Sequence, residues 1–93
     1  QLGENASEEQ NSEQVELSAY RMFINQIETL TKAERIVFDL YIAGLNSHEV
    51  ANKLNLSINT IRTHNRNIYA KLNVTSYKEM MVYVQMMTGK QKN

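Results

Sequence analysis

Apolar residues recur three or four positions apart along most of the chain, which is the spacing of a helix with one buried face. The pattern begins at about residue 13 and continues to about residue 88, interrupted by short stretches of Asn, Ser, Thr and Gly. In the first segment, residues 13–29, the apolar positions of one face are Tyr20, Phe23, Ile24 and Ile27. Four further segments of this kind follow, so the sequence predicts an all-α fold of four helices preceded by one extra helix.

Residues that commonly begin or end helices stand at the borders of these segments. In a capping box, the side chain before a helix and a Glu three positions later each bond the other residue's backbone N–H group. Three pairs have this spacing: Thr31 with Glu34, Asn46 with Glu49, and Ser76 with Glu79. Gly44 and Asn73 follow two of the segments, where many helices end on a residue with a left-handed backbone.

The segment from Ser57 to Leu72 is predicted to form a helix with two different faces. Its apolar residues fall within one third of the helix circumference: Ile58, Ile61, Ile68 and Leu72. The opposite side carries amide, hydroxyl and guanidinium groups and no carboxylate: Asn59, Arg62, Thr63 and Arg66. Guanidinium groups bind phosphate oxygens and the acceptor-rich edge of guanine. In an isolated segment, such a face is more often the solvated side of an ordinary helix.

The residues before this segment favour a more specific interpretation. A short helical stretch around Val50 and Leu54 precedes it, and Asn55–Ser57 has the composition of a tight turn. Two helices joined by such a turn, the second with a basic outer face, predict a helix-turn-helix, whose second helix enters the major groove of DNA. Arg62 and Arg66 then stand one helical turn apart, where each can reach bases or phosphates.

The charges of the chain are unevenly distributed, although its net charge is zero. Residues 1–16 contain five Glu and no Lys or Arg, whereas from Lys53 onward seven Lys or Arg stand against Glu79 alone. Residues 1–12 have almost no apolar side chains, which predicts a disordered acidic leader, and residues 89–93 are expected to form a disordered tail. A basic C-terminal half is compatible with binding to a polyanion.

Several kinds of chemistry have no support in the sequence. Cysteine is absent, which excludes disulfides and thiolate metal sites. His48 and His64 lie on different predicted helices without a carboxylate cluster, so no metal site, catalytic residue or cofactor is expected. The longest apolar runs are shorter than a membrane span, and no signal-peptide pattern opens the chain. We therefore expect a cytoplasmic protein that is not an enzyme and has no membrane partner.

Between residues 30 and 87 the sequence resembles the LuxR-type DNA-binding domain, the C-terminal domain of many bacterial response regulators and quorum-sensing activators. The matching residues are in register and without gaps: Leu30, Thr31, Glu34, Arg35, Val37, Gly44, Leu45, Glu49, Val50, Ala51, Leu54, Ser57, Thr60, Ile61, Arg62, Thr63, His64, Asn67, Ile68, Lys71, Leu72, Val74 and Ser76. The resemblance implies a four-helix DNA-binding domain over residues 30–88, with residues 13–29 as a linker or support helix. The helix of about Ser57–Leu72 would lie in the major groove.

The resemblance also implies roles for individual residues. Base contacts fall on Arg62, Thr63 and Arg66. Phosphate contacts fall on Asn46, Ser47, Asn59, Thr60 and Asn65, to which Lys71 adds general electrostatic attraction. The last helix, apolar on nearly every side, is expected to form a homodimer contact through Met80, Tyr83, Val84 and Met87. The expected partners are double-stranded DNA, a second copy of the chain and RNA polymerase.

Two other functions fit the same features. One is a sigma-factor-like region that binds a promoter as part of RNA polymerase, although the Gly44-Leu45 turn and the Thr60–His64 string favour the LuxR type. The other is a helical protein-interaction module whose basic face docks an acidic partner. The salt dependence of binding to genomic DNA fragments distinguishes DNA binding from this second alternative.

Overall fold

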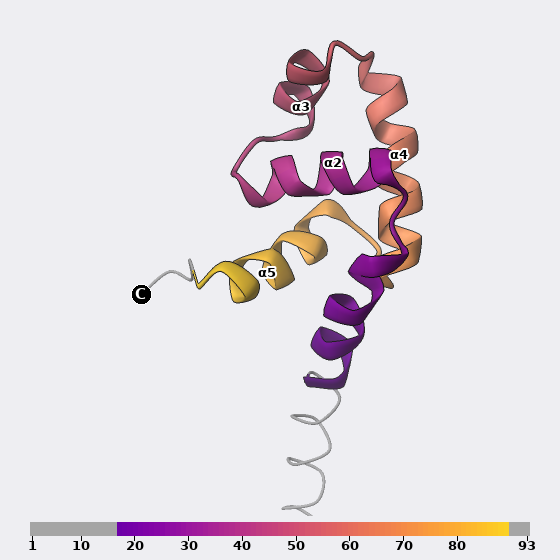
Figure 1. The fold of residues 1–93 in the computed structure, drawn as a ribbon. Coiled ribbons are helices and arrows are strands. Elements are labelled where there is room, and N and C mark those ends of the chain that lie inside the picture. The colour runs from indigo at the N-terminus through magenta and orange to yellow at the C-terminus, as the bar shows by residue number, and fades with distance from the viewer. Residues whose placement is uncertain (1–16, 90–93) are drawn as a thin grey trace, which may run out of the picture.

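Five α-helices and one short 3-10 helix follow one another along the described part of the chain (Figure 1). The computed structural model describes residues 17–89, so the predicted leader and nearly all of the predicted tail lie outside it. The elements are a helix over residues 17–26, η1 (Ile27–Thr29), α2 (Lys32–Ile42), α3 (Ser47–Leu54), α4 (Ile58–Leu72) and α5 (Tyr77–Thr88). The predicted all-α class is confirmed for these residues, among which there is no strand. Within residues 17–89, none of the helices has the length and hydropathy needed to cross a membrane.

Two of the three predicted capping boxes are complete. At the start of α2, Glu34 N–H donates to the Thr31 hydroxyl oxygen at 3.1 Å, and Thr31 N–H donates to Glu34 Oε1 at 2.9 Å. At the start of α3, the corresponding bonds between Asn46 and Glu49 are 2.9 and 2.8 Å long. Each box satisfies backbone donors that the helix itself leaves unpaired.

The third predicted capping box, at the start of α5, is only half formed. Ser76 Oγ accepts from Glu79 N–H at 3.1 Å, as expected. The Glu79 carboxylate, however, bonds Thr75: its Oε1 accepts from the Thr75 N–H at 2.8 Å and from the Thr75 hydroxyl at 2.9 Å. Thr75 offers two donors to one carboxylate oxygen where the Ser76 backbone offers one, which explains the departure from the predicted box.

Each of the three connections between α2 and α5 contains a residue of positive φ within two positions of the preceding helix end. Gly44 (φ 104°) follows α2, Asn55 (58°) follows α3 and Asn73 (61°) follows α4. In each case the next N–H group bonds the carbonyl five residues earlier: Leu45 to Leu40, Leu56 to Ala51, and Val74 to Tyr69. The predicted helix ends at Gly44 and Asn73 are therefore confirmed. A side chain would be strained at the backbone conformation of Gly44.

The longest helix within residues 17–89, α4, contacts α2, α3, α5 and η1. Figure 1 shows it along one side of the molecule, with α2 and α5 lying across it. Its buried side chains Ile61, Ile68 and Leu72 share one core with residues of the other elements: Phe23, Ile27, Val37, Phe38, Tyr41, Val50, Ala51, Val74, Met80 and Val84. This packing buries one face of α4 and leaves the opposite face in solvent.

The helix over residues 17–26 is part of the same core. Phe23 has no exposed surface, and its ring centroid lies 6.0 Å from that of Phe38 in α2 and 4.9 Å from that of Tyr83 in α5. Tyr20 also stacks on Tyr83, with 6.0 Å between centroids. The segment expected to be a linker or support helix thus contributes directly to the packing of the domain.

Candidate nucleic-acid interface

The helix-turn-helix predicted from the sequence consists of α3 and α4. Asn55, Leu56 and Ser57 join the two helices, and Ser57 Oγ accepts from Thr60 N–H at 3.1 Å, which caps α4. Figure 1 shows α3 beside the N-terminal end of α4, with α2 crossing below both. Because α2 and α3 cover only the inner side of this end, its outer face is accessible.

The predicted base contacts lie on this accessible face. Arg62, Thr63 and Arg66 are all exposed, and so is Asn59, whose Oδ1 accepts from Arg62 Nη1 at 3.4 Å. Thr63 donates its hydroxyl proton to the Asn59 carbonyl at 3.2 Å. Among residues 17–89, neither arginine forms an ion pair with a carboxylate. Both guanidinium groups can therefore bind an external anion.

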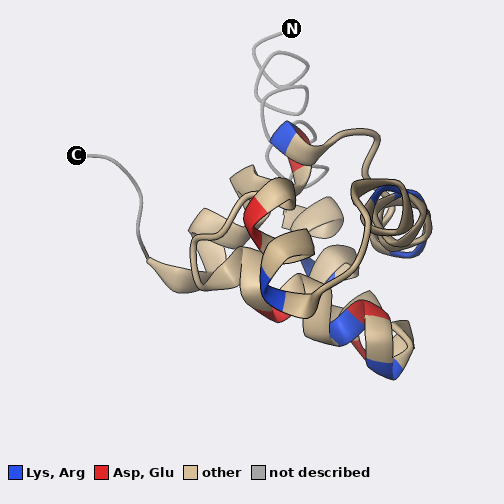
Figure 2. Ribbon diagram, turned by 90° about the horizontal axis from the view of Figure 1, so that it is seen from above, with Lys and Arg blue, Asp and Glu red and all other residues tan. Residues whose placement is uncertain are grey.

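Positive charge on α4 is not accompanied by negative charge. The helix holds Arg62, Arg66 and Lys71 and no Asp or Glu, and Figure 2, in which α4 is seen nearly end on, shows blue segments and no red ones on it. In contrast, α2, α3 and α5 each carry acidic residues. An anionic ligand therefore meets the least repulsion at the outer face of α4.

Four of the predicted phosphate contacts stand at helix starts. Asn59 and Thr60 are exposed in the first turn of α4, and Asn46 is exposed at the N-cap of α3. Ser47, the first residue of α3, is half-buried, and its hydroxyl oxygen lies 2.9 Å from Tyr41 Oη. The first turn of a helix has backbone N–H groups without intrahelical partners and the positive end of the helix dipole, and both attract phosphate. These two helix starts are compatible with phosphate contacts.

Asn65 does not fit the expected phosphate contact, because its side chain points into the protein. It is 8% exposed, its Oδ1 accepts from the Tyr41 hydroxyl at 2.6 Å, and its Nδ2 donates to Ser47 Oγ at 3.3 Å. Asn65 stands four residues after Ile61 and three before Ile68, which places it on the buried face of α4. We therefore exclude it from the proposed phosphate contacts.

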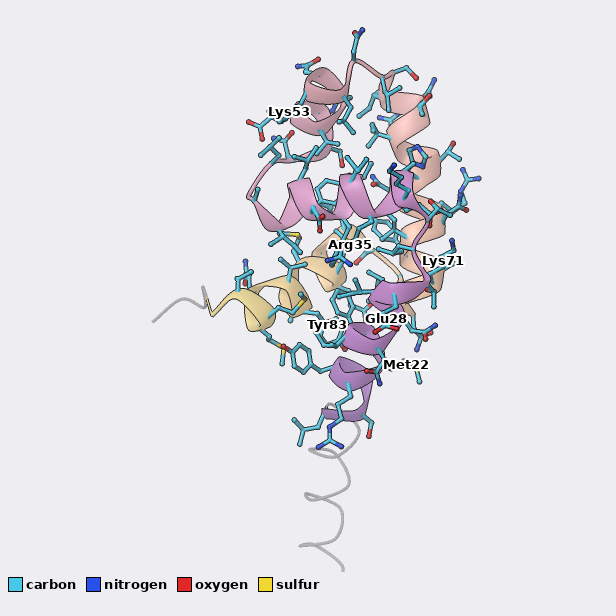
Figure 3. The ribbon with its side chains drawn as sticks, in the orientation of Figure 1. Met22, Glu28, Arg35, Lys53, Lys71 and Tyr83 are labelled. Atoms are coloured by element: carbon cyan, nitrogen blue, oxygen red, sulfur yellow. The ribbon has the colours of Figure 1, made fainter. Side chains whose placement is uncertain are left out.

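Lys71 is engaged within the protein. Its Nζ lies 2.7 Å from Glu34 Oε1, and the Glu34 side chain is 6% exposed. The Lys71 carbonyl accepts from Gln26 Nε2 at 3.3 Å. Figure 3 shows Lys71 at the C-terminal end of α4, beside η1. Lys71 anchors this end of the helix, so its ammonium group is not a free ligand for phosphate.

The carboxyl group of Glu34 makes stability depend on pH. Burial raises the pKa of Glu34, but the hydrogen bond and charge of Lys71 and the N–H of Thr31 outweigh burial, so the pKa lies below its usual value. The ionised form is the one that binds Lys71. Its contribution to stability is fully present above the usual pKa of the unfolded chain and is lost as pH falls through the lowered pKa of the folded protein.

We expect Glu34→Gln to lower the free energy of unfolding at neutral pH by about 1–3 kcal/mol, because the amide keeps an acceptor for Thr31 but offers Lys71 no charge. The difference from the unsubstituted chain should begin to shrink as pH falls below about 4, the ordinary pKa of a glutamate in an unfolded chain, and should disappear once pH has fallen through the lowered pKa of Glu34 in the folded protein. Urea denaturation of both proteins over a series of pH values measures this. A difference that is independent of pH would show that the charge of Glu34 contributes nothing.

The residues predicted for a dimer contact do not all lie at the surface. Met80 and Val84 are 0% and 2% exposed and belong to the core, which corrects the prediction for these two. Met87 is half-buried, and so is Tyr83, which packs against Phe23. Because α5 is apolar on nearly every side, its sequence pattern did not reveal which side is buried.

One side of α5 forms a hollow at the surface. Its volume is about 320 Å³, and the described residues that line it are Glu79, Val82, Tyr83 and Met86. These residues stand three or four positions apart and therefore share one helix face. Val82 is 51% exposed, and Figure 3 shows Tyr83 between α5 and the helix over residues 17–26. Solvent therefore reaches apolar side chains on this face of α5.

Residues 28–84 match the family described as bacterial regulatory proteins, luxR family. The match covers more than half of the chain, and the chain belongs to this family. It confirms the resemblance found over residues 30–87.

The chain is also similar to proteins named HTH-type transcriptional regulator MalT. It is 40% identical over 53 residues to the protein of Vibrio campbellii, 40% over 50 residues to that of Vibrio cholerae, and 38% over 56 residues to that of Yersinia pestis. These alignments cover 57%, 54% and 60% of this chain but only 6% of each relative, so the chain corresponds to a small part of those regulators. No solved structure matches the chain significantly.

Proposed function

We propose that this chain binds double-stranded DNA sequence-specifically, as the output domain of a bacterial transcriptional regulator that acts in the cytoplasm together with RNA polymerase. The observation that carries the proposal is the pair Arg62 and Arg66, which are exposed on the second helix of a helix-turn-helix and have no carboxylate partner among the described residues. Membership of the luxR family supports it, as do relatives named transcriptional regulators.

In this proposal, the N-terminal half of α4 lies in the major groove. Arg62 and Arg66 are four residues apart, or about 6 Å along the helix axis. This rise is close to two base-pair steps of about 3.4 Å. Each guanidinium group can donate two parallel hydrogen bonds to O6 and N7 of a guanine, and Thr63 between them can contact a neighbouring base.

Contacts to the sugar–phosphate backbone orient α4 in the groove. Asn59 and Thr60 provide them from the start of α4, while Asn46 and the N–H of Ser47 provide them from the start of α3. Phosphate contacts carry little sequence information, but they fix the register and orientation of a protein on the duplex. Two separate helix starts hold the DNA at two points, which sets both the depth and the angle of α4.

Selection of bound fragments from genomic DNA, at several salt concentrations, tests the proposed function. We expect the enriched fragments to share a short sequence, and the logarithm of the binding constant to fall linearly with the logarithm of the salt concentration, because bound phosphates release counterions. Failure to retain any DNA at low salt would contradict DNA binding. Capture of an acidic protein in that case would favour the protein-interaction module.

We further propose that the chain dimerises on DNA through Val82, Tyr83 and Met86 of α5. Apolar side chains that solvent reaches on one helix face are a common feature of protein contact surfaces. A twofold dimer would present two copies of α4 to half-sites about 34 Å apart, one turn of the duplex. A contact made by one short helix is small, so weak association is expected in the absence of DNA.

Val82→Glu is expected to prevent this dimerisation without unfolding the domain, because Val82 is half exposed and a carboxylate there remains solvated. Sedimentation of the chain at high concentration, alone and on DNA with two half-sites, measures the effect. Gln85→Glu adds the same charge at an exposed position that does not line the hollow, and should leave assembly unchanged. A natural chain that is monomeric under both conditions would rule out the dimer.

A further inference from the structure

Three helices of the domain are joined by a closed ring of hydrogen bonds between Tyr41, Ser47 and Asn65. Tyr41 belongs to α2, Ser47 is the first residue of α3, and Asn65 lies in the middle of α4. Tyr41 Oη is 2.6 Å from Asn65 Oδ1 and 2.9 Å from Ser47 Oγ, and Asn65 Nδ2 is 3.3 Å from Ser47 Oγ. Tyr41 is fully buried and Asn65 is 8% exposed, so water competes little for these groups.

The direction of each bond follows from the number of protons that each group carries. The amide oxygen of Asn65 can only accept, so Tyr41 gives it its single hydroxyl proton. Ser47 must then donate its own proton to Tyr41 Oη, and it accepts from Asn65 Nδ2. The three bonds run in one direction around the ring, an arrangement in which each bond polarises the next. Burial raises the pKa of Tyr41, against the effect of its bonds to Ser47 and Asn65, so its hydroxyl remains a donor at neutral pH.

The ring lies on the inner side of the residues proposed to contact DNA. Asn65 stands between Arg62 and Arg66 in the sequence, but its side chain lies on the buried face of α4 while theirs are exposed, so its bonds fix the rotation of α4 about its own axis. Ser47 stands at the start of α3, where a backbone N–H group is proposed to bind phosphate. The Asn65–Ser47 bond thereby connects the base-contacting helix to the phosphate-contacting helix start.

We propose that the ring of Tyr41, Ser47 and Asn65 positions α3 and α4 for DNA recognition, holding them at the one placement in which phosphate and base contacts form together. This inference rests on the proposed function. Apolar residues of similar size at these sites would stabilise the fold about as well, because replacing all partners of a buried hydrogen bond by apolar groups is often nearly neutral. They would not impose the directions that hydrogen bonds impose, so the ring contributes to geometry rather than to stability.

The double variant Tyr41→Phe with Asn65→Leu tests this role, because it removes two members of the ring and leaves Ser47 half-buried with access to water. We expect it to melt cooperatively and to bind non-specific DNA with unchanged salt dependence. Its preference for the enriched fragment over non-specific DNA should fall roughly tenfold, comparable to the loss of one guanine-bound arginine. Tyr77→Phe is the matched control, since Tyr77 packs edge-on against Tyr41 with 5.3 Å between ring centroids but is not part of the ring. It should keep the full preference.

Each outcome of this experiment bears either on the positioning role of the ring or on DNA binding itself. If the double variant does not fold, Tyr41→Phe alone removes a single oxygen and carries the same expectation. A folded variant that keeps the full preference overturns the positioning role. An equal loss of specific and non-specific binding also overturns it, because that is the effect of losing folded protein. A natural chain that shows no preference among DNA sequences instead contradicts the proposed function.

Discussion

Replacing Arg62 or Arg66 with Ala is expected to remove base preference at particular positions of the bound DNA without unfolding the domain. A bidentate arginine–guanine contact is worth about 1–3 kcal/mol of discrimination, or roughly 5- to 150-fold. A phosphate contact instead adds affinity for every sequence alike. Both side chains are exposed, so the free energy of unfolding should change by less than about 0.5 kcal/mol. Binding to a library of single-base variants of the enriched fragment, together with thermal melts, measures both quantities.

Lys78→Ala is the control for this experiment. Lys78 is exposed on α5, outside the helix-turn-helix, and its charge can attract phosphate but is not proposed to read a base. Its removal should weaken binding to all library members by a similar factor. If both arginine variants melt normally and keep the affinity and preference of the natural chain, the face of α4 that carries them does not read the DNA.

Phe23→Ala is expected to lower the free energy of unfolding by about 3–5 kcal/mol, although Phe23 precedes the residues that match the luxR family. Its side chain is fully buried between Phe38 and Tyr83, so truncation removes apolar contacts on two elements and leaves a cavity. For a small domain, a loss of this size is a large fraction of total stability. Urea denaturation followed by circular dichroism measures it.

Met22→Ala provides a comparison within the same helix. Met22 is adjacent to Phe23 in the sequence but is 48% exposed, so its truncation should change stability by less than about 1 kcal/mol. If Phe23→Ala is as mild as Met22→Ala, the helix over residues 17–26 does not fold together with the remainder of the domain. A large difference would instead extend the folding unit beyond the segment that defines the family.

Local chemistry was sufficient to predict most of the helix boundaries. The capping boxes at Thr31 and Asn46 and the left-handed residues Gly44 and Asn73 depend only on neighbours in the sequence, and all were found as predicted. The start of α5 differed because Thr75 supplied donors that compete with Ser76, a choice that spacing alone does not decide.

The departures within the candidate site come from tertiary packing. The partner of Lys71 is Glu34, which is 37 positions away, and no local pattern predicts that pair. The burial of Met80 and Val84 depends on which side of an all-round apolar helix meets the core. Asn65 is different, since its spacing from Ile61 and Ile68 already placed it on the inner face. Its polar side chain is satisfied there because Tyr41 supplies a buried hydroxyl, which the periodicity of α4 does not reveal.

One carboxylate oxygen, Glu34 Oε1, accepts both from the Thr31 N–H at the start of α2 and from the Lys71 ammonium group at the end of α4. When the start of α2 or the end of α4 opens, Glu34 is displaced and its bond to the other helix end weakens. We therefore expect the first turn of α2 and the last turn of α4 to open together. Backbone amides in the first turn of α2 and the last turn of α4 should therefore exchange their hydrogens with solvent as one cooperative unit. The first turns of α4 lie outside that unit and are held instead through the bonds of Asn65 to Tyr41 and Ser47, so the two ends of the same helix are stabilised by separate contacts.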